Sequence, residues 1–167
     1  KNKKISQVYK VQNKSIELSL LLSLPASLAL IIGSEEIVNA LFGYGSFTEN
    51  DVEQTSLALK YFGYGVPAFA VLKIFANFFF ARDNTMTPFK VSSVVVFVNI
   101  AVSVLFFGQF GFIIIPIATT LSTWIGVFYY LYILLKIGFL KIDYNFYRNF
   151  MKIVFATSVI SYILNTC

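Results

Sequence analysis

The sequence predicts an all-α membrane protein, a polytopic bundle of about five transmembrane helices. Five mainly apolar stretches have the length, about 20 residues, that an α-helix needs to cross the hydrocarbon core of a bilayer. Residues 94–98, Val-Val-Val-Phe-Val, have no polar face to present to water. The hydrophobic fraction is 57%, and the charged fraction of 13% is about half of the soluble average. The predicted spans are residues 15–33, 57–81, 88–107, 112–135 and 150–166.

The connectors between these spans alternate in charge sign, and this predicts an orientation. Before the first span lie Lys1, Lys3, Lys4, Lys10 and Lys14. The first connector holds Glu35, Glu36, Glu49, Asp51 and Glu53. Because basic loops stay on the cytoplasmic side, we expect the basic end in the cytoplasm and the acidic connector outside. The bases lie at membrane edges rather than on one folded patch, so we expect membrane lipid as a partner and no nucleic acid.

Composition also excludes several kinds of chemistry. The chain has no histidine, and its one cysteine is the last residue, Cys167. A disulfide framework, a zinc site and Cys-His catalysis are therefore excluded within this stretch. We expect no carboxylate in the membrane core, no enzyme activity, no metal site and no cofactor. The chain lacks an initial Met and ends inside an apolar run, so residues 1–167 are expected to be one internal fragment of a longer transmembrane domain.

The first span is expected to bend at Pro25, where proline removes one backbone hydrogen bond. Serines recur every fourth residue from Ser19 to Ser27, and their face could satisfy the freed carbonyl. Beyond the span, Ser34 followed by two glutamates is typical of a helix start. We expect residues 35–47 to form an amphipathic segment on the outer membrane surface.

The second span is expected to begin just after Thr48, because Thr48 and Asp51 have the spacing of a capping box. From there to Ala81 is about 50 Å of helix, more than the membrane thickness. Within it, Pro67 follows Gly63 by four residues, and glycine at the position where the proline ring clashes predicts a tolerated kink. The kink is either a structural bend or a mark of a substrate or ion path.

The third and fourth spans are predicted to be antiparallel neighbours. Thr87 and Pro88 are typical of an N-cap and a first helical position, and the turn at 108–111 is tight. Pro116 is a further expected bending point. A seam of small residues for close helix approach follows in the fourth span: Ala118, Ser122 and Gly126.

Lys73 and Asn77, one turn apart in the second span, are candidates for contact with a substrate or a cavity. Lys73 lies about 13 Å from the predicted cytoplasmic edge, and helical side chains lean toward the N-terminus, here the outer face. A charge left in lipid at this depth costs about 2.5–3.5 kcal/mol. We therefore predict that both residues face a watery cavity. A neutral lysine and a structural pairing are the alternatives.

Asn99, Ser103 and Thr119 form a second predicted polar cluster. Asn99 and Thr119 are nearly equidistant from the turn at 108–111, so they are expected at the same depth, and Ser103 is one turn from Asn99. Their oxygens could coordinate a coupling ion such as Na⁺. Interhelical hydrogen bonds explain the same residues and are the favoured interpretation, because no acid joins them.

Two stretches carry specific patterns. Residues 41–48 read Leu-Phe-Gly-Tyr-Gly-Ser-Phe-Thr, and residues 79–90 read Phe-Phe-Ala-Arg-Asp-Asn-Thr-Met-Thr-Pro-Phe-Lys. Both resemble motifs of the MurJ (MviN) lipid II flippase family, in the MOP exporter superfamily. The positions that match the second motif are Arg82, Thr85, Thr87 and Pro88. Phe80 and Asn84 depart from it, because the family pattern has Tyr and Asp there.

The resemblance covers essentially the whole chain and implies part of the second lobe of a fourteen-helix, alternating-access transporter. Such a protein would flip the undecaprenyl-linked peptidoglycan precursor, lipid II, across the bacterial cytoplasmic (inner) membrane for cell-wall synthesis. The remaining helices of the full-length chain would be partners. The arginines that the family is thought to use for the pyrophosphate lie in earlier helices, so only Lys73 is carried over as a substrate candidate.

Two other functions stay open. A related exporter of polysaccharide-linked lipids or drugs would share the architecture, and the composition of the first lobe would distinguish it. A non-transporting membrane scaffold belongs to a different class. Lys73 and Asn99 inside the membrane argue against a scaffold, since lipid-facing helices gain nothing from them.

Overall fold

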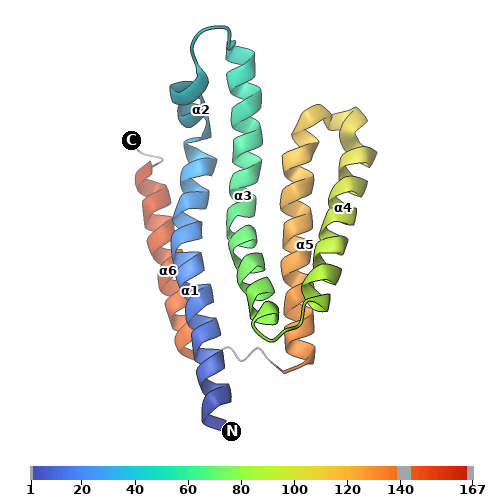
Figure 1. Cartoon of the computed structure of the whole chain (residues 1–167). Helices are drawn as coiled ribbons and strands as arrows, with labels where there is room; N and C mark the ends of the chain where they lie inside the picture. Colours follow the sequence, from blue (N-terminus) through green and yellow to red (C-terminus); the bar gives the residue numbers. More distant parts are fainter. Residues whose placement is uncertain (1, 139–143, 165–167) are drawn as a thin grey trace.

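A computed structural model describes residues 2–138 and 144–164 of the chain, and every structural statement below concerns those residues. They form helices joined by short turns, without a strand (Figure 1). The elements are α1 (Asn2–Ile32), α2 (Ser34–Phe42), α3 (Glu49–Phe80), α4 (Met86–Phe110), the 3-10 turn η1 (Gly111–Ile113), α5 (Ile114–Lys136) and α6 (Tyr144–Leu164). The all-α membrane bundle predicted from the sequence is confirmed.

The long helices lie side by side in the order α6, α1, α3, α5, α4, so that α3 is central (Figure 1). The α3–α4 connector lies at the same end as the start of α1, whereas α2 and the α4–α5 turn lie at the other. The acids of residues 35–53 are therefore at the end opposite to Arg82. We call these the acidic end and the basic end of the bundle.

Three stretches are long and apolar enough to cross a membrane: Tyr9–Ile32, Glu49–Phe80 and Met86–Lys136. The third has 51 residues and folds back at Gly111, so it supplies two antiparallel helices, α4 and α5. The fifth predicted span, 150–166, corresponds to α6 up to residue 164 and lies outside the described residues beyond it. Its membrane crossing stays a prediction.

The start of α3 agrees with the capping box. The Thr48 hydroxyl accepts a hydrogen bond from the Asp51 backbone N–H at 3.3 Å, and the Asp51 carboxylate accepts one from the Thr48 N–H at 2.9 Å. The Thr48 hydroxyl also donates to this carboxylate at 2.7 Å, and this bond, together with the one from the Thr48 N–H, lowers the pKa of Asp51 below its usual value of 3.8. The amphipathic segment is α2, which begins at Ser34 with Glu35 and Glu36 in its first turn, as predicted; its N-cap is Gly33, without a side-chain hydrogen bond.

Two helix boundaries differ from the prediction. α4 begins at Met86, so Thr87 is not its N-cap; instead the Asn84 side-chain oxygen accepts the Thr87 backbone N–H at 3.0 Å. At its other end α4 continues through Phe110, and only the η1 turn separates it from α5. Residues 108–110 of the predicted turn therefore belong to α4, and the chain reverses only from Gly111 onward.

The prolines divide into two groups. Pro25 lies inside α1 and Pro67 inside α3, as expected for bending points. Pro116 is only the third residue of α5, where a backbone N–H has no intrahelical partner in any case. A bend at Pro116 stays a prediction.

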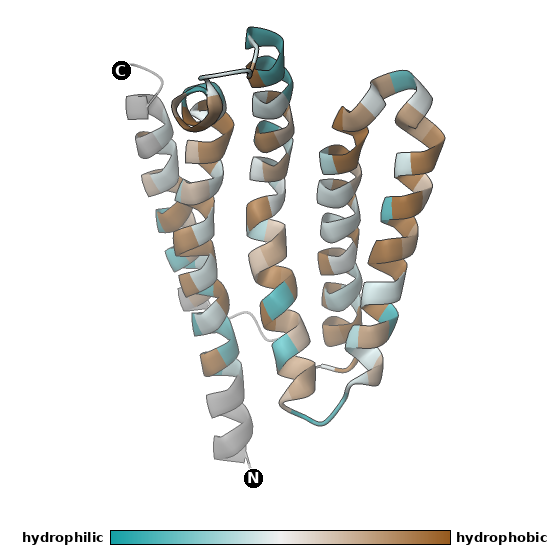
Figure 2. Cartoon of the chain, turned by 45° about the horizontal axis from the view of Figure 1, so that its top comes forward, coloured by the Kyte–Doolittle hydropathy of each residue, from teal (hydrophilic) through white to brown (hydrophobic). Residues whose placement is uncertain are grey.

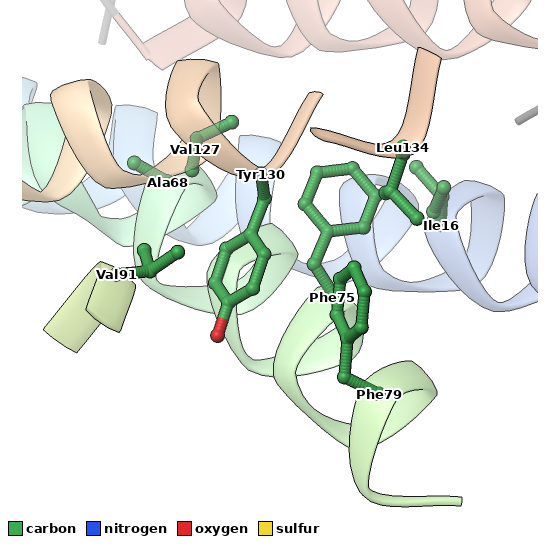
Figure 3. Close-up of a cluster of buried hydrophobic side chains, with 8 residues drawn as sticks. All are labelled: Ile16, Ala68, Phe75, Phe79, Val91, Val127, Tyr130 and Leu134. Carbon is green, nitrogen blue, oxygen red and sulfur yellow. The ribbon is translucent and has the colours of Figure 1, made fainter. Parts of the chain in front are cut away.

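The apolar core lies toward the basic end, where α1, α3, α4 and α5 meet (Figure 3). Phe75 and Phe79 of α3 contact the ring of Tyr130 of α5, with centroids 6.1 and 5.6 Å apart. The buried members are Ile16, Ala68, Phe75, Phe79, Val91, Val127, Tyr130 and Leu134. Elsewhere large apolar side chains stay exposed, such as Phe97 and Leu105 on α4, which suits a surface that faces lipid (Figure 2).

Candidate functional site

Lys73 and Asn77 lie on α3, between Pro67 and the basic end of the helix. Both side chains are exposed, and so are Phe69 and Phe80 on the same side of the helix. No described helix covers this face, because α1 and α5 pack against the other sides of α3. Hydrophilic positions interrupt the apolar lower part of α3 in Figure 2. The structure thus places both residues on one uncovered face, as a cavity wall requires.

The part of α3 just before Pro67 contacts α1. Pro67 has no N–H, so the carbonyl of Gly63 lacks its usual intrahelical donor. The Ser27 hydroxyl of α1 donates a hydrogen bond to that carbonyl oxygen at 2.7 Å. The serine hydroxyls of α1 were expected to donate a hydrogen bond to the carbonyl that Pro25 leaves without a donor in α1 itself. Ser27 donates to the neighbouring helix instead. The buried hydroxyl of Ser23 makes no hydrogen bond to the described residues.

Asn99 and Thr119 do meet at the same depth. The Asn99 side-chain amide donates to the Thr119 hydroxyl at 2.9 Å, and the Thr119 hydroxyl donates to the Ile115 carbonyl at 2.8 Å. This is the interhelical hydrogen bond favoured from the sequence. Ser103 is close to this level on α4, but its buried hydroxyl makes no hydrogen bond to the described part of the chain.

The motif residues form the connector between α3 and α4. The Arg82 guanidinium lies over the ring of Phe78, 3.8 Å from its centroid, and partial burial lowers the pKa of Arg82. Asp83 has a φ of 56° and turns the chain, while Pro88 is buried and Thr85 exposed. The N-cap of α4 is Thr85, and the Asn84 side-chain oxygen next to it accepts the Thr87 N–H; the carboxylate of the family's usual Asp also has such an oxygen.

One buried carboxylate was not among the residues predicted from the sequence. Glu17 of α1 is 7% exposed, and both of its carboxylate oxygens accept the side-chain amide of Asn149 of α6 at 3.2 Å. Lys14 forms an ion pair with it at 3.2 Å. Glu17 is the third residue of the first predicted span, at its basic-end edge, so the expectation of no carboxylate in the membrane core stays a prediction. The signal was present, because Glu17 is the only acid within residues 15–33.

Comparisons with known proteins agree with this architecture. The family model described as lipid II flippase MurJ matches residues 1–166. A probable lipid II flippase MurJ of Rickettsia prowazekii is 34% identical over 131 residues, 77% of this chain and 26% of the relative. One of Rhizobium tropici is 30% identical over 155 residues, 93% of this chain and 29% of the relative.

A solved structure also shares the fold. The structure of a lipid II flippase MurJ in an inward closed conformation superposes with a TM-score of 0.83 and 24% identity, over 95% of this chain and 32% of that chain. The chain therefore spans about a third or less of the proteins that it matches. With a family match over nearly its whole length and a multi-pass helical architecture, this chain belongs to the MurJ family.

Proposed function

We propose that the full-length protein flips lipid II, the undecaprenyl-linked precursor of peptidoglycan, across the bacterial cytoplasmic membrane. The family match over residues 1–166 carries this proposal. The protein would act as a transporter rather than an enzyme, and this chain would supply part of the second lobe. The basic end of the bundle would face the cytoplasm.

Lys73 is the residue of this chain that we propose to meet the substrate. Its charge lies on an uncovered face of α3, and a lysine in lipid would pay an insertion cost that a watery cavity removes. A pyrophosphate headgroup supplies the opposite charge, which would favour an ammonium group at this position. Asn77, one turn away, would add hydrogen bonds to the same headgroup.

We further propose that the Asn99–Thr119 hydrogen bond holds α4 against α5. The Ser103 hydroxyl, which has no hydrogen-bond partner among residues 2–138 and 144–164, leaves one more oxygen near that pair. Binding of a coupling cation such as Na⁺ is therefore the alternative role to test. Thermal unfolding of the full-length protein in NaCl and in choline chloride of equal ionic strength separates the two roles. An unfolding temperature that does not depend on Na⁺ would leave only the helix pairing.

Related exporters of drugs or of polysaccharide-linked lipids remain the main competitor, and a membrane scaffold is a second. The family match supports lipid II over these alternatives. The test is complementation of a bacterium depleted of its own lipid II flippase, with the full-length gene. Growth and normal cell shape are expected, and failure despite normal membrane expression would contradict the proposal.

Lys73→Met tests the substrate role within that assay. We expect loss of complementation at normal expression, whereas Lys73→Arg should keep most activity because the charge remains. Lys60→Met is a matched control, since Lys60 is another exposed lysine of α3 but lies toward the acidic end. Full activity of Lys73→Met would remove Lys73 from the mechanism.

A further inference from the structure

The backbone of α3 just before Pro67 is contacted by side-chain donors from both neighbouring helices. On the α1 side, the Ser27 hydroxyl donates to the Gly63 carbonyl, which Pro67 leaves without a donor. On the α5 side, the Thr120 hydroxyl donates to the Tyr61 carbonyl at 2.8 Å and the Trp124 indole N–H donates to the Tyr64 carbonyl at 3.2 Å. We call Ser27, Thr120 and Trp124 the α3 clasp.

The hydroxyl of Thr120 differs from those of its neighbours. Thr119 and Thr123 both donate to a carbonyl of their own helix, four residues earlier, which is the usual bond of a helical threonine. Thr120 instead donates to a carbonyl of α3. Its hydroxyl therefore contributes to how α3 and α5 are placed relative to each other, and not to α5 alone.

Two glycines allow the helices to approach closely at this level. A Cβ atom on Gly63 would lie 2.9 Å from Ile31 of α1, and a Cβ atom on Gly65 would lie 2.9 Å from the Thr120 hydroxyl. Both distances are shorter than side-chain atoms tolerate. Helix contacts in membranes depend on such small residues, because lipid tails remove the hydrophobic drive for association.

We propose that the α3 clasp sets the bend of α3 at Pro67 and thereby positions Lys73 and Asn77. The helix before Pro67 is held on two sides, while the helix after it carries Lys73 and Asn77 on its uncovered face. A change in the spacing of α1 and α5 would pull on the two sides of the clasp and tilt the following turns. Ser27, Thr120 and Trp124 are positioning residues. Their role in transport rests on the proposed function, whereas their role in the bend does not.

The bend is measured first, in the full-length protein with all its native cysteines, Cys167 among them, replaced by serine. Spin labels at Leu18 of α1 and Phe80 of α3, both exposed, report the distance between the basic-end parts of these helices. We expect Thr120→Val to shift or broaden this distance distribution, and Thr120→Ser to retain the native one. Thr123→Val is the matched control, because it removes a buried hydroxyl that bonds within α5. An unchanged distribution in Thr120→Val would overturn the clasp.

A second pair of variants separates the clasp from general packing. Pro67→Ala supplies the N–H that the Gly63 carbonyl lacks, so Ser27→Ala should alter the distance distribution in the native background and no longer do so beside Pro67→Ala. An equal effect in both backgrounds would overturn the role of Ser27.

Lipid II transport in proteoliposomes gives the functional readout. Loss of the Thr120 hydrogen bond should lower the transport rate about threefold. This factor corresponds to the average free energy of one interhelical hydrogen bond in a membrane. A shifted distance distribution at an unchanged rate would overturn the positioning of Lys73. Failure of the unsubstituted protein to transport lipid II, with the distance shifts present, would contradict the proposed function and leave the bend-setting role supported.

Discussion

The two halves of α3 are held in the bundle by different interactions. Toward the basic end, Phe75 and Phe79 pack against Tyr130, and the contact depends on the volume of large side chains. Around Gly63 and Gly65 side chains of α1 and α5 lie against the backbone of α3, and the contact depends on the absence of a side chain at the glycines and on hydroxyl donors. One helix thus combines a part fixed by packing with a part fixed by directional bonds, and the two parts join at a proline.

The largest expected effect is in the packed half. Tyr130→Ala should lower the stability of the full-length protein by about 3–5 kcal/mol, the usual cost of deleting a buried aromatic ring. Tyr130 is 1% exposed, whereas Tyr132 on the same helix is 61% exposed. Thermal unfolding in detergent should therefore separate Tyr130→Ala from Tyr132→Ala. Equal unfolding temperatures of the two variants would contradict the packing of this half.

The half of α3 around Gly63 and Gly65 should lose stability when a side-chain atom is added, rather than when one is removed. Gly63→Ala places a methyl group 2.9 Å from Ile31, and we expect a loss of about 1–3 kcal/mol from overpacking. Gly108→Ala is the control, since a Cβ atom there meets nothing within 4 Å. Alanine also suits a helix better than glycine, so this control should be neutral or slightly stabilising. The unfolding midpoint in denaturant measures both, and a neutral Gly63→Ala would remove the close contact.

The smallest effect is expected at the start of α3, outside both halves. Hydrogen bonds from Thr48 lower the pKa of Asp51, so the stabilisation of the first turn is complete above the usual value of 3.8 and is lost as pH falls through the lower folded value. Amide exchange in this turn should be slower in the native protein than in Asp51→Asn at pH 7. The difference should shrink below about pH 4.

Glu53→Gln provides the control for that comparison, because Glu53 is an exposed acid of the same turn region. It should exchange like the native protein at both pH values. A difference between native protein and Asp51→Asn that stays constant with pH would show that the ionised carboxylate contributes nothing to the cap.

Local signals in the sequence predicted the helices and several contacts. The Thr48–Asp51 spacing predicted a cap, and the equal distance of Asn99 and Thr119 from a turn predicted a hydrogen bond. Both succeed because a tight turn or a single helix end fixes the geometry. The start of α4 was placed two residues too late, since Asn84 rather than Thr87 supplies the side-chain oxygen at the helix start.

The α3 clasp and the Glu17–Asn149 contact could not be derived in this way. Periodicity gives the depth and the face of a residue but not the neighbour on that face. Nothing local distinguishes Thr119, which bonds to its own helix, from Thr120, which bonds to α3. Likewise the partner of Glu17 is 132 residues away, on a helix whose place beside α1 follows only from the assembled bundle.

The fold-back at Gly111 also has a consequence for biosynthesis. Residues Met86–Lys136 form one apolar stretch, and the helices reverse where Gly111 adopts a φ of 59° that a residue with a side chain rarely accepts. The insertion machinery therefore receives a hairpin whose tip carries no charge to pull across the bilayer. Both arms would enter lipid together, and their polar pair, Asn99 and Thr119, would be satisfied during entry rather than after assembly with later helices.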